Sequence, residues 1–295
     1  MTWTNPLIKR AVLDSPVVEA NPVIWEGRLL VVERWTTRWA QPPEEPPRYG
    51  ARIREEGTDE ILWEGLWGYG LSSAFVWGGR LYVFAASNRN EGANTIDVCS
   101  TADLTSWTKP QVAIPQDEDG TLYNQSVCWD GARFVMAYET RAGVPFTSKF
   151  AASDDLLRWT PIPGAEHGRD RYAACPALRF CGGWYYMLYL ARPTDEWWFE
   201  TWLTRSRDLA HWEEAPRNPV IAPDPDLGVY PGCPEHGSAR GCTAGRREIN
   251  TSDPDLVEWE GRTRVYFTGG CQHECGRLQY AEFGGSMQEM FEAYY

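Results

Sequence analysis

The sequence predicts an all-β fold, a five-bladed β-propeller with four antiparallel strands in each blade, on the strength of two repeated patterns. The first is a hairpin, in which an apolar run, a glycine turn and a second apolar run follow one another, as in NPVIWEGRLLVVE. Its glycines Gly27, Gly79, Gly131 and Gly183 recur at intervals of 52 residues, and a fifth copy places Gly261 78 residues after Gly183. A regular period of this length indicates a repeat architecture.

The second pattern is a turn that occurs in STADLTSW, ASDDLLRW and RSRDLAHW, each with an Asp-Leu pair ahead of a tryptophan. The aspartates Asp103, Asp155 and Asp208 are spaced by 52 and 53 residues. We expect each turn to join the third strand of a blade to the fourth, with its tryptophan packed back onto the sheet as a structural residue. Because one four-stranded sheet cannot bury both of its faces alone, such units are typical of propeller blades. The tryptophans are Trp107, Trp159 and Trp212.

The five units account for nearly the whole chain, so we expect a single propeller domain over residues 1–295. The long fifth interval is explained by a Pro-, Gly- and Cys-rich insertion at about 213–247, between blades four and five. Loops of this length are often lids or binding loops. The Pro-rich segment 36–50 is expected to form an exposed loop within blade one. The C-terminal GSMQEMFEAYY is expected to form a short amphipathic helix that covers one face of the propeller.

Composition limits the classes of partner. The formal charge of −13 and the isoelectric point near 4.9 argue against nucleic acid or an anionic membrane, whereas a neutral or cationic small molecule fits this balance. No apolar run approaches the roughly 20 residues of a membrane span, and no apolar segment follows the basic residues near the N-terminus, so we expect a cytoplasmic protein. The motif CQHEC lacks a second Cys/His pair at zinc-finger spacing, so no metal site is expected. The oligomeric state is left open.

The candidate site follows from the repeat. In a propeller the first strand of each blade lines the central channel, and its first residues converge at one mouth, where polar groups form the default site. Eight positions ahead of the repeat glycines stand Glu19, Leu71, Tyr123, Cys175 and Asp253. Six positions ahead stand Asn21, Ser73, Gln125, Ala177 and Asp255. Carboxylates thus occur at these positions only in blades one and five, which ring closure makes neighbours.

Glu19, Asp253 and Asp255 are therefore the first catalytic candidates. Glycoside hydrolysis needs one carboxyl group as the acid and a second as the base or nucleophile. The alternative is that an acidic residue at a strand start binds loop amides or a cation. Glu139, at the end of the second strand of blade three, is a further candidate acid or a solvated strand end. Glu33 offers the same choice in blade one, where we favour a solvated strand end.

The insertion and the remaining mouth residues supply weaker candidates. Glu235 could act as another acid and His236 could bind substrate or an ion, or both are exposed loop residues. Other substrate-binding candidates are amides, which hydrogen-bond to sugar hydroxyls, and aromatic rings, on which sugars stack. They are Asn21, Asn124, Gln125, Tyr123, Trp35 and Trp67.

The five-blade pattern, the SxDLxxW turns and the strand DPDLVEWEGRTRVYF resemble the arabinanase, β-xylosidase and invertase superfamily of five-bladed propellers, which includes glycoside hydrolase family 43. The resemblance covers essentially the full chain. It implies an enzyme that hydrolyses or transfers furanosyl or pyranosyl groups of a small-molecule or oligosaccharide substrate, with three acidic residues in the central funnel. It implies no required cofactor, although a structural cation such as calcium, or a bound water, can occupy the channel of such proteins. More distant relatives phosphorolyse mannosides.

The chain departs from this family at two of its acidic positions. The Asp-Pro of the first blade is Asn21-Pro22 here, and the blade-four strand reads AACPALRF, with Ala174 and Cys175 where many members carry their acid. The sequence therefore predicts a glycosidase with relocated acids. The alternatives are a noncatalytic carbohydrate-binding propeller, a glycoside phosphorylase-like transferase and a protein-interaction scaffold.

Overall fold

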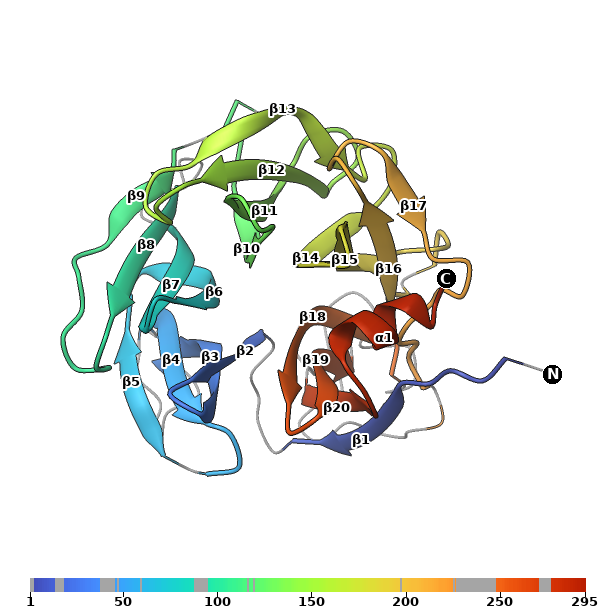
Figure 1. Cartoon of the computed structure of the whole chain (residues 1–295), viewed down its shortest axis with the longest axis horizontal. Coiled ribbons are helices and arrows are strands. Elements are labelled where there is room, and N and C mark those ends of the chain that lie inside the picture. The colour runs from blue at the N-terminus through green and yellow to red at the C-terminus, as the bar shows by residue number, and fades with distance from the viewer. Residues whose placement is uncertain are drawn as a thin grey trace.

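Five four-stranded antiparallel sheets stand around a central axis in the computed structural model of the chain (Figure 1). The structure describes residues 3–13, 19–37, 46, 48–58, 60–87, 95–115, 117–118, 120–196, 198–224, 226, 248–270 and 277–295. Each sheet is one blade, and its inner strand is the first half of the hairpin found in the sequence. The predicted five-bladed β-propeller is confirmed.

The strands follow the repeat in chain order. Blade one holds β2 (Ala20–Trp25), β3 (Arg28–Thr36), β4 (Tyr49–Glu55) and β5 (Ile61–Gly65). Blade two holds β6 (Tyr69–Trp77), β7 (Arg80–Ser87), β8 (Ile96–Thr101) and β9 (Gln111–Ile114). Blade three holds β10 (Tyr123–Trp129), β11 (Phe134–Thr140), β12 (Thr147–Ser153) and β13 (Thr160–His167). Blade four holds β14 (Ala173–Cys181), β15 (Trp184–Ala191), β16 (Glu200–Ser206) and β17 (Trp212–Glu214).

Blade five is completed by the two ends of the chain. It holds β18 (Asn250–Trp259), β19 (Arg262–Gly270), β20 (Arg277–Phe283) and, as its outer strand, β1 (Ile8–Val12). β1 pairs antiparallel with β20, and Lys9 donates across this blade to Glu248 over 2.9 Å. Because IKRAV is no part of the repeated hairpin, the repeat does not predict this ring closure.

The Asp-Leu turn has the same geometry in blades two, three and four. In blade three the Oδ1 atom of Asp155 accepts the backbone N–H groups of Leu157 and Arg158 over 2.9 and 2.8 Å. Leu156 adopts a left-handed backbone with φ of 65°, and the indole of Trp159 donates to its carbonyl over 3.2 Å. These bonds satisfy the turn locally.

The turn tryptophans also join neighbouring blades. Trp107 stacks on Trp63 of blade one with ring centroids 4.2 Å apart, and Trp212 stacks on Phe150 of blade three at 5.3 Å. Trp159 meets Phe84 of blade two edge-on at 5.9 Å. Their expected structural role is confirmed, and each ring packs against the preceding blade as well as its own sheet.

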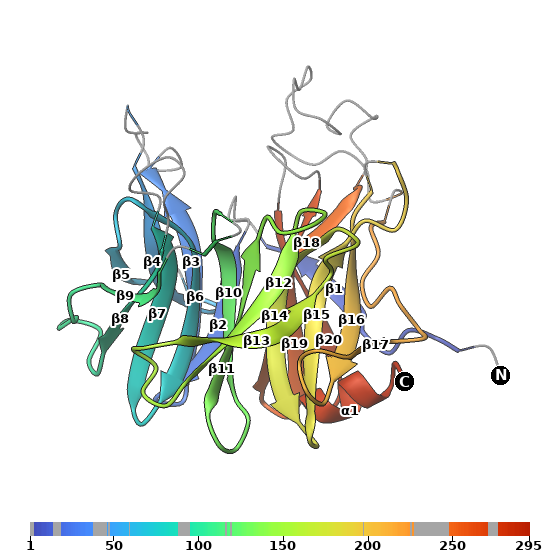
Figure 2. The ribbon, with the colours of Figure 1, turned by 90° about the horizontal axis from the view of Figure 1, so that it is seen from above.

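The C-terminal helix is α1 (Met287–Glu292), and it lies on one face of the propeller beside blades four and five (Figure 2). A capping box between Ser286 and Glu289 starts it, and Met290 and Phe291 are buried against blades four and five. The predicted helix is confirmed. No helix among the described residues is long and apolar enough to cross a membrane.

The first part of the predicted insertion belongs to the core. Ala215, Val220 and Ile221 are buried in the cluster that joins blades four and five. Ile221 also pairs with Thr201 next to β16. Residues 227–247, which form most of the insertion, lie outside the described residues.

Candidate active site

A β-bulge recurs where the inner strands begin. The pairing of β6, β14 and β18 with the next strand shifts near their first residues. At each shift one residue has a left-handed backbone, namely Leu71, Cys175 and Asp253, with φ of 54°, 53° and 52°. All three stand eight positions ahead of a repeat glycine. A bulge of this kind re-aims a side chain, and residues held with positive φ cluster at functional sites.

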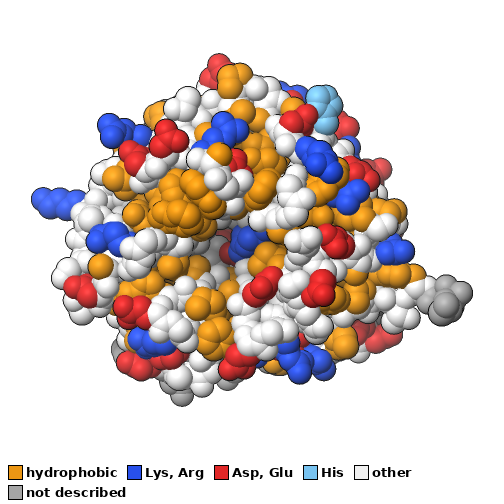
Figure 3. All heavy atoms as spheres, in the orientation of Figure 1, with side chains coloured by type: hydrophobic (Ala, Val, Ile, Leu, Met, Phe, Trp, Pro, Cys, Tyr) orange, Lys and Arg blue, Asp and Glu red, His pale blue; other side chains and the backbone are white. Residues whose placement is uncertain are grey.

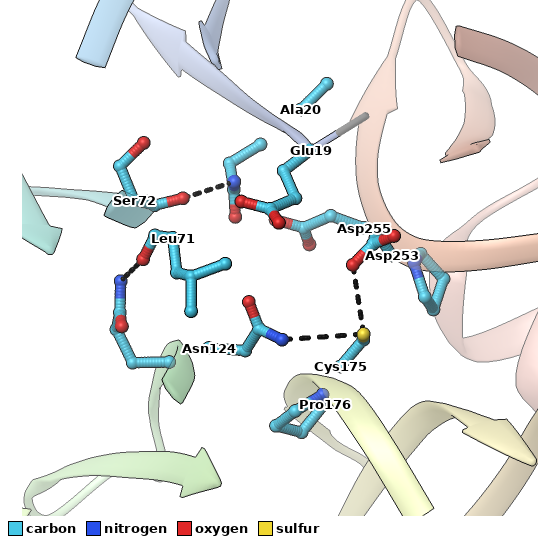
Figure 4. Close-up of a pocket in the computed structure, with 12 residues that line it drawn as sticks. Glu19, Ala20, Leu71, Ser72, Asn124, Cys175, Pro176, Asp253 and Asp255 are labelled. Carbon is cyan, nitrogen blue, oxygen red and sulfur yellow. Dashed lines mark hydrogen bonds between the residues drawn. The ribbon is translucent and has the colours of Figure 1, made fainter. Parts of the chain in front are cut away.

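The starts of the inner strands enclose a cavity of about 380 Å³. Its wall holds three carboxyl groups, from Glu19 ahead of β2, Glu139 near the end of β11 and Asp253 in β18. Figure 4 shows a narrower cavity, described below, around which Glu19, Asp253, Asn124 and Cys175 are grouped; these four residues line both cavities. The structure therefore brings two of the three first candidates, and the further candidate Glu139, to one cavity.

Glu139 is buried, and in the described part of the chain only one of its two oxygens accepts hydrogen bonds. Its Oε1 accepts the amide of Asn124 over 3.0 Å and the backbone N–H of Cys175. Burial raises the pKa of Glu139 to about 8, and the charges of Asp253 and Glu19 act in the same direction. The carboxyl group therefore carries a proton near neutral pH, and Oε2 is the oxygen left for it.

Asp253 accepts hydrogen bonds from a thiol and a hydroxyl group. The thiol of Cys175 donates to its Oδ1 over 2.9 Å, and the hydroxyl of Ser252 donates to its Oδ2 over 2.5 Å. Burial raises its pKa, whereas these two donors and the charge of Arg34 oppose the shift. Two donors and the positive charge of Arg34 thus favour the charged form of Asp253.

Glu19 lies between a positive and a negative neighbour. Arg34 donates to its Oε1 over 3.4 Å, and its Oε2 is buried without a partner among the described residues. Burial raises the pKa of Glu19 to about 7; Arg34 lowers the pKa and Asp253 raises it. Glu19 therefore titrates close to neutral pH.

Asp255 has different partners from Asp253, although only one residue separates them. Its Oδ1 accepts a bond from Arg179 of blade four over 2.5 Å and from the backbone of Leu256 over 2.8 Å. Arg179 also donates to the carbonyl of Leu256 over 2.7 Å. Asp255 is absent from the wall of the 380 Å³ cavity. Its ion pair with Arg179 joins blades four and five.

The predicted amides divide into two roles. Asn124 lies in the cavity beside Glu139. Asn21 donates to the carbonyl of Ser72 over 2.7 Å, and Gln125 donates to that of Leu71 over 2.6 Å. These last two bonds connect the inner strands of blades one and three to blade two, so the amide nitrogens of both residues are occupied by backbone carbonyls.

Of the predicted stacking aromatics, Tyr123 lines the cavity. Trp35 is buried beneath the guanidinium of Arg52 at 3.6 Å, and Trp67 lies beneath that of Arg48 at 4.3 Å. Neither tryptophan belongs to the cavity wall. The structure thus leaves one of the three aromatic candidates next to the carboxyl groups.

The sequence does not point to several residues of the cavity wall, and three of them bear on its chemistry. Phe146 and Tyr172 form an aromatic wall with ring centroids 5.8 Å apart, and Phe146 meets Tyr123 edge-on at 5.2 Å. Arg34 is the third. Phe146 and Tyr172 lie outside the strands that carry the repeat, so the glycine register gives no signal for them. Arg34 follows Glu33 in β3, where strand alternation places the two side chains on opposite faces.

Glu33 is not a solvated strand end. It is fully buried, its Oε2 accepts two bonds from Arg52 over 3.0 and 2.7 Å, and its Oε1 accepts one from Arg54 over 2.6 Å. Our expectation for this residue is corrected, because two arginines from β4 reach it. Glu235 and His236 lie outside the described residues.

A second, narrow cavity of about 30 Å³ lies deeper in the channel. Its buried oxygens without partners in the described part of the chain belong to Glu19, Ser72 and Gln125. Calcium takes six to eight oxygen ligands, and the described residues contain no group of three or more His, Cys, Asp or Glu able to hold a metal ion. These residues do not by themselves form a calcium site, and the volume suits a water molecule.

The other end of the channel has a different character. Figure 3 shows the face that carries α1, where hydrophobic side chains gather around a central hollow. A cavity of about 280 Å³ on this side is lined mainly by apolar groups, including Phe75, Trp129 and Phe180, with Arg179 and Asp255 at its polar side. The carboxyl groups of the site therefore face the opposite mouth.

These features define the class of fold, a five-bladed β-propeller with carboxyl groups at its central mouth. No protein-family model matches the chain, and no curated protein matches it in sequence. Solved structures do match. The chain is similar to a thermostable family-43 glycoside hydrolase at 11% identity, with a TM-score of 0.64 over 92% of this chain and 91% of that one.

Two further structures extend the likeness. An α-L-arabinofuranosidase from Podospora anserina, solved with cellotriose, matches with a TM-score of 0.60 at 12% identity, over 94% of each chain. A structure described with the family-130 mannoside phosphorylases and glycoside hydrolases that target β-1,2 mannosidic linkages matches with a TM-score of 0.59 at 14% identity, over 92% of this chain and 85% of that one. At these identities the likeness establishes the fold, and the chemistry depends on this chain's own residues.

Proposed function

We propose that the protein is a glycoside hydrolase in which Glu139 is the general acid and Asp253 the base or nucleophile. The observation that carries the proposal is the buried Glu139, whose pKa is raised to about 8 by burial, in one cavity with Asp253 and Glu19. Two carboxyl groups with different protonation states are what glycoside hydrolysis requires. The fold of the structural neighbours supports a carbohydrate-active protein.

Glu139 is suited to donate a proton to the leaving oxygen. Its Oε1 accepts bonds from Asn124 and Cys175, so the acidic proton occupies Oε2. The carboxyl group of Glu139 also lies beside Cys175 of blade four. Cys175 and its neighbour Ala174 stand where the family resemblance leads us to expect the acidic residue of blade four. The acid that blade four lacks is therefore supplied by the neighbouring strand of blade three.

Burial raises the pKa of Asp253, but Cys175, Ser252 and Arg34 all favour its charged form, which suits it to the second role. Glu19 influences the protonation of the two proposed catalytic groups. Its charge raises the pKa of Glu139, and the charge of Asp253 raises the pKa of Glu19. Asp255 is left as a structural residue that joins two blades. Tyr123, Phe146 and Tyr172 provide apolar surface for a sugar ring.

The test is hydrolysis of a panel of aryl glycosides and oligosaccharides by the wild type and by Glu139→Gln and Asp253→Asn. Removal of either group is expected to lower kcat by about 100-fold or more. Glu60→Gln is the matched control, since Glu60 is exposed and outside the cavity wall. Full activity in both site variants would overturn the assignment.

The same panel separates the alternative of a noncatalytic carbohydrate-binding propeller. The absence of a carboxyl group at Asn21 and Ala174 favours that alternative. It predicts saturable binding of a sugar by the wild type, with no turnover of any member of the panel.

A further inference from the structure

We propose that Arg34 and Arg141 select a substrate that carries a carboxylate, so that the site takes glycosides of acidic sugars. This inference rests on the proposed function and names its substrate class. The net charge of −13 favours a neutral or cationic ligand for the chain as a whole, but the charges at the mouth decide what enters it.

Arg34 lies in the cavity wall with N–H donors that have no acceptor among the described residues. It lines the wall, and 34% of its side chain is exposed. Its one side-chain hydrogen bond among the described residues goes to Glu19 over 3.4 Å, which is long for a charged pair. A guanidinium has five N–H donors. Most of these are therefore open to a ligand in the cavity.

Arg141 supplies a second positive charge from another blade. It follows β11 two residues after Glu139 and is exposed, and its guanidinium lies 5.4 Å from the ring centroid of Tyr123, a cavity wall residue. No carboxylate in the described part of the chain pairs with it. By contrast, Arg52 pairs with the buried Glu33, and Arg54 pairs with both Glu33 and Glu56.

The three carboxyl groups of the cavity do not forbid an anionic substrate. Burial raises the pKa of Glu139 to about 8 and that of Glu19 to about 7, so the site carries fewer negative charges than its residue types suggest. Arg34 then offsets much of the charge on Asp253, and Arg141 adds a positive charge near the rim.

A sugar carboxylate fits these groups better than inorganic phosphate. A carboxylate matches the fork of a guanidinium with a single negative charge. Phosphate carries up to two charges and would be repelled more strongly by any ionised carboxyl group of the cavity. A volume of about 380 Å³ is in the range of small-ligand pockets, so it has room for a sugar ring beside the carboxylate.

The test is calorimetric binding of methyl glucuronide and methyl galacturonide, each compared with its neutral methyl glycoside. The wild type is expected to bind at least one uronide about tenfold more tightly than the neutral counterpart, since one charge-assisted contact is worth about that factor. Arg34→Gln and Arg141→Gln are each expected to reduce this preference by about tenfold. The control Arg158→Gln, in the outer turn of blade three, is expected to keep it.

Two results would overturn the inference. The first is equal affinity of the wild type for the uronides and the neutral glycosides. The second is displacement of a bound uronide by equimolar inorganic phosphate, which would assign the two arginines to phosphate. Thermal unfolding of each variant checks that it folds, and Arg141 is exposed enough for its variant to do so.

The outcome for the proposed function is separate, because binding is measured without turnover. A preference for uronides with no hydrolysis of any glycoside would contradict the proposed function and support the inference. Hydrolysis of neutral glycosides with no preference for uronides would support the proposed function and overturn the inference.

Discussion

The thiol of Cys175 donates a hydrogen bond to Asp253 over 2.9 Å, while the backbone N–H of the same residue donates to Glu139. One residue of blade four thus holds the two carboxyl groups to which we assign the chemistry, although these groups come from blades five and three. The left-handed backbone of Cys175, with φ of 53°, turns its N–H and its side chain to these two partners.

Replacement of this thiol tests how far it sets the state of Asp253. Cys175→Ala is expected to raise the pKa of Asp253 and to lower kcat/KM by about 10- to 100-fold, since a hydrogen bond to a charged group is worth about 1.5–3 kcal/mol. Cys175→Ser keeps a donor and is expected to restore most of the activity. The pH dependence of kcat/KM is the measurement, and a Cys175→Ala enzyme with an unchanged profile would contradict the role.

The free energy of unfolding is expected to fall as the pH rises from about 4.5 to about 8. Burial raises the pKa of Glu139 to about 8 and that of Glu19 to about 7, above the 4.5 of an exposed glutamate. Between these values the folded chain binds more protons than the unfolded chain. The stability is therefore fully present below about pH 4.5 and is lost as the pH passes the folded values.

Urea unfolding of the wild type near pH 5 and near pH 8.5 measures this slope. Glu139→Gln removes the group with the higher of the two pKa values and is expected to reduce the slope of stability against pH. The variant therefore gains stability relative to the wild type at the higher pH. Glu60→Gln, exposed and away from the cavity, is expected to leave the slope as it is. A wild-type slope in Glu139→Gln would show that the group does not titrate in this range.

Asp255 is expected to matter for stability and to be dispensable for chemistry. Asp255→Asn leaves Arg179 without its carboxylate at the junction of blades four and five, and the loss is expected to be about 3 kcal/mol. Activity per folded molecule is expected to stay within about twofold of the wild type. The urea midpoint and kcat measure the two effects.

The matched variant is the double replacement of Asp255 and Arg179 by Leu and Met, which removes both charges together. It is expected to recover part of the stability lost in Asp255→Asn, because no unpaired buried charge remains. If Asp255→Asn were stable and inactive, Asp255 would return to the catalytic group.

The repeat explains which parts of the site could be predicted from the sequence. The glycine register identified the residues that meet at the mouth, because every inner strand starts at a fixed distance from its turn. The register is symmetrical about the turn as well: Glu139 stands eight residues after Gly131 and pairs with Tyr123, which stands eight before it. This pairing with Tyr123 is the sequence signal that places Glu139 at the same mouth as Glu19 and Asp253, and so among the first catalytic candidates.

The register could not separate Asp253 from Asp255, since it records position along a strand and not the partner from another blade. Arg179 meets Asp255, while Cys175 meets Asp253, and both partners come from β14. The positive φ at Asp253 is also invisible in the sequence, because such a backbone is expected at glycine. Long-range pairings of this kind depend on how the blades pack.

The buried Glu33 gives the last prediction. Its two oxygens accept three bonds from Arg52 and Arg54, and Arg52 also stacks on Trp35 at 3.6 Å. Glu33→Gln leaves two guanidiniums of blade one without their shared carboxylate, so we expect a loss of about 3–5 kcal/mol in the free energy of unfolding. Urea unfolding measures it, and the double variant with Arg52→Gln is expected to recover part of the loss. The hydrogen bonds from Arg52 and Arg54 of β4 leave Glu33 no access to a substrate. Unchanged stability combined with lost activity would contradict this structural role and place Glu33 in the active site.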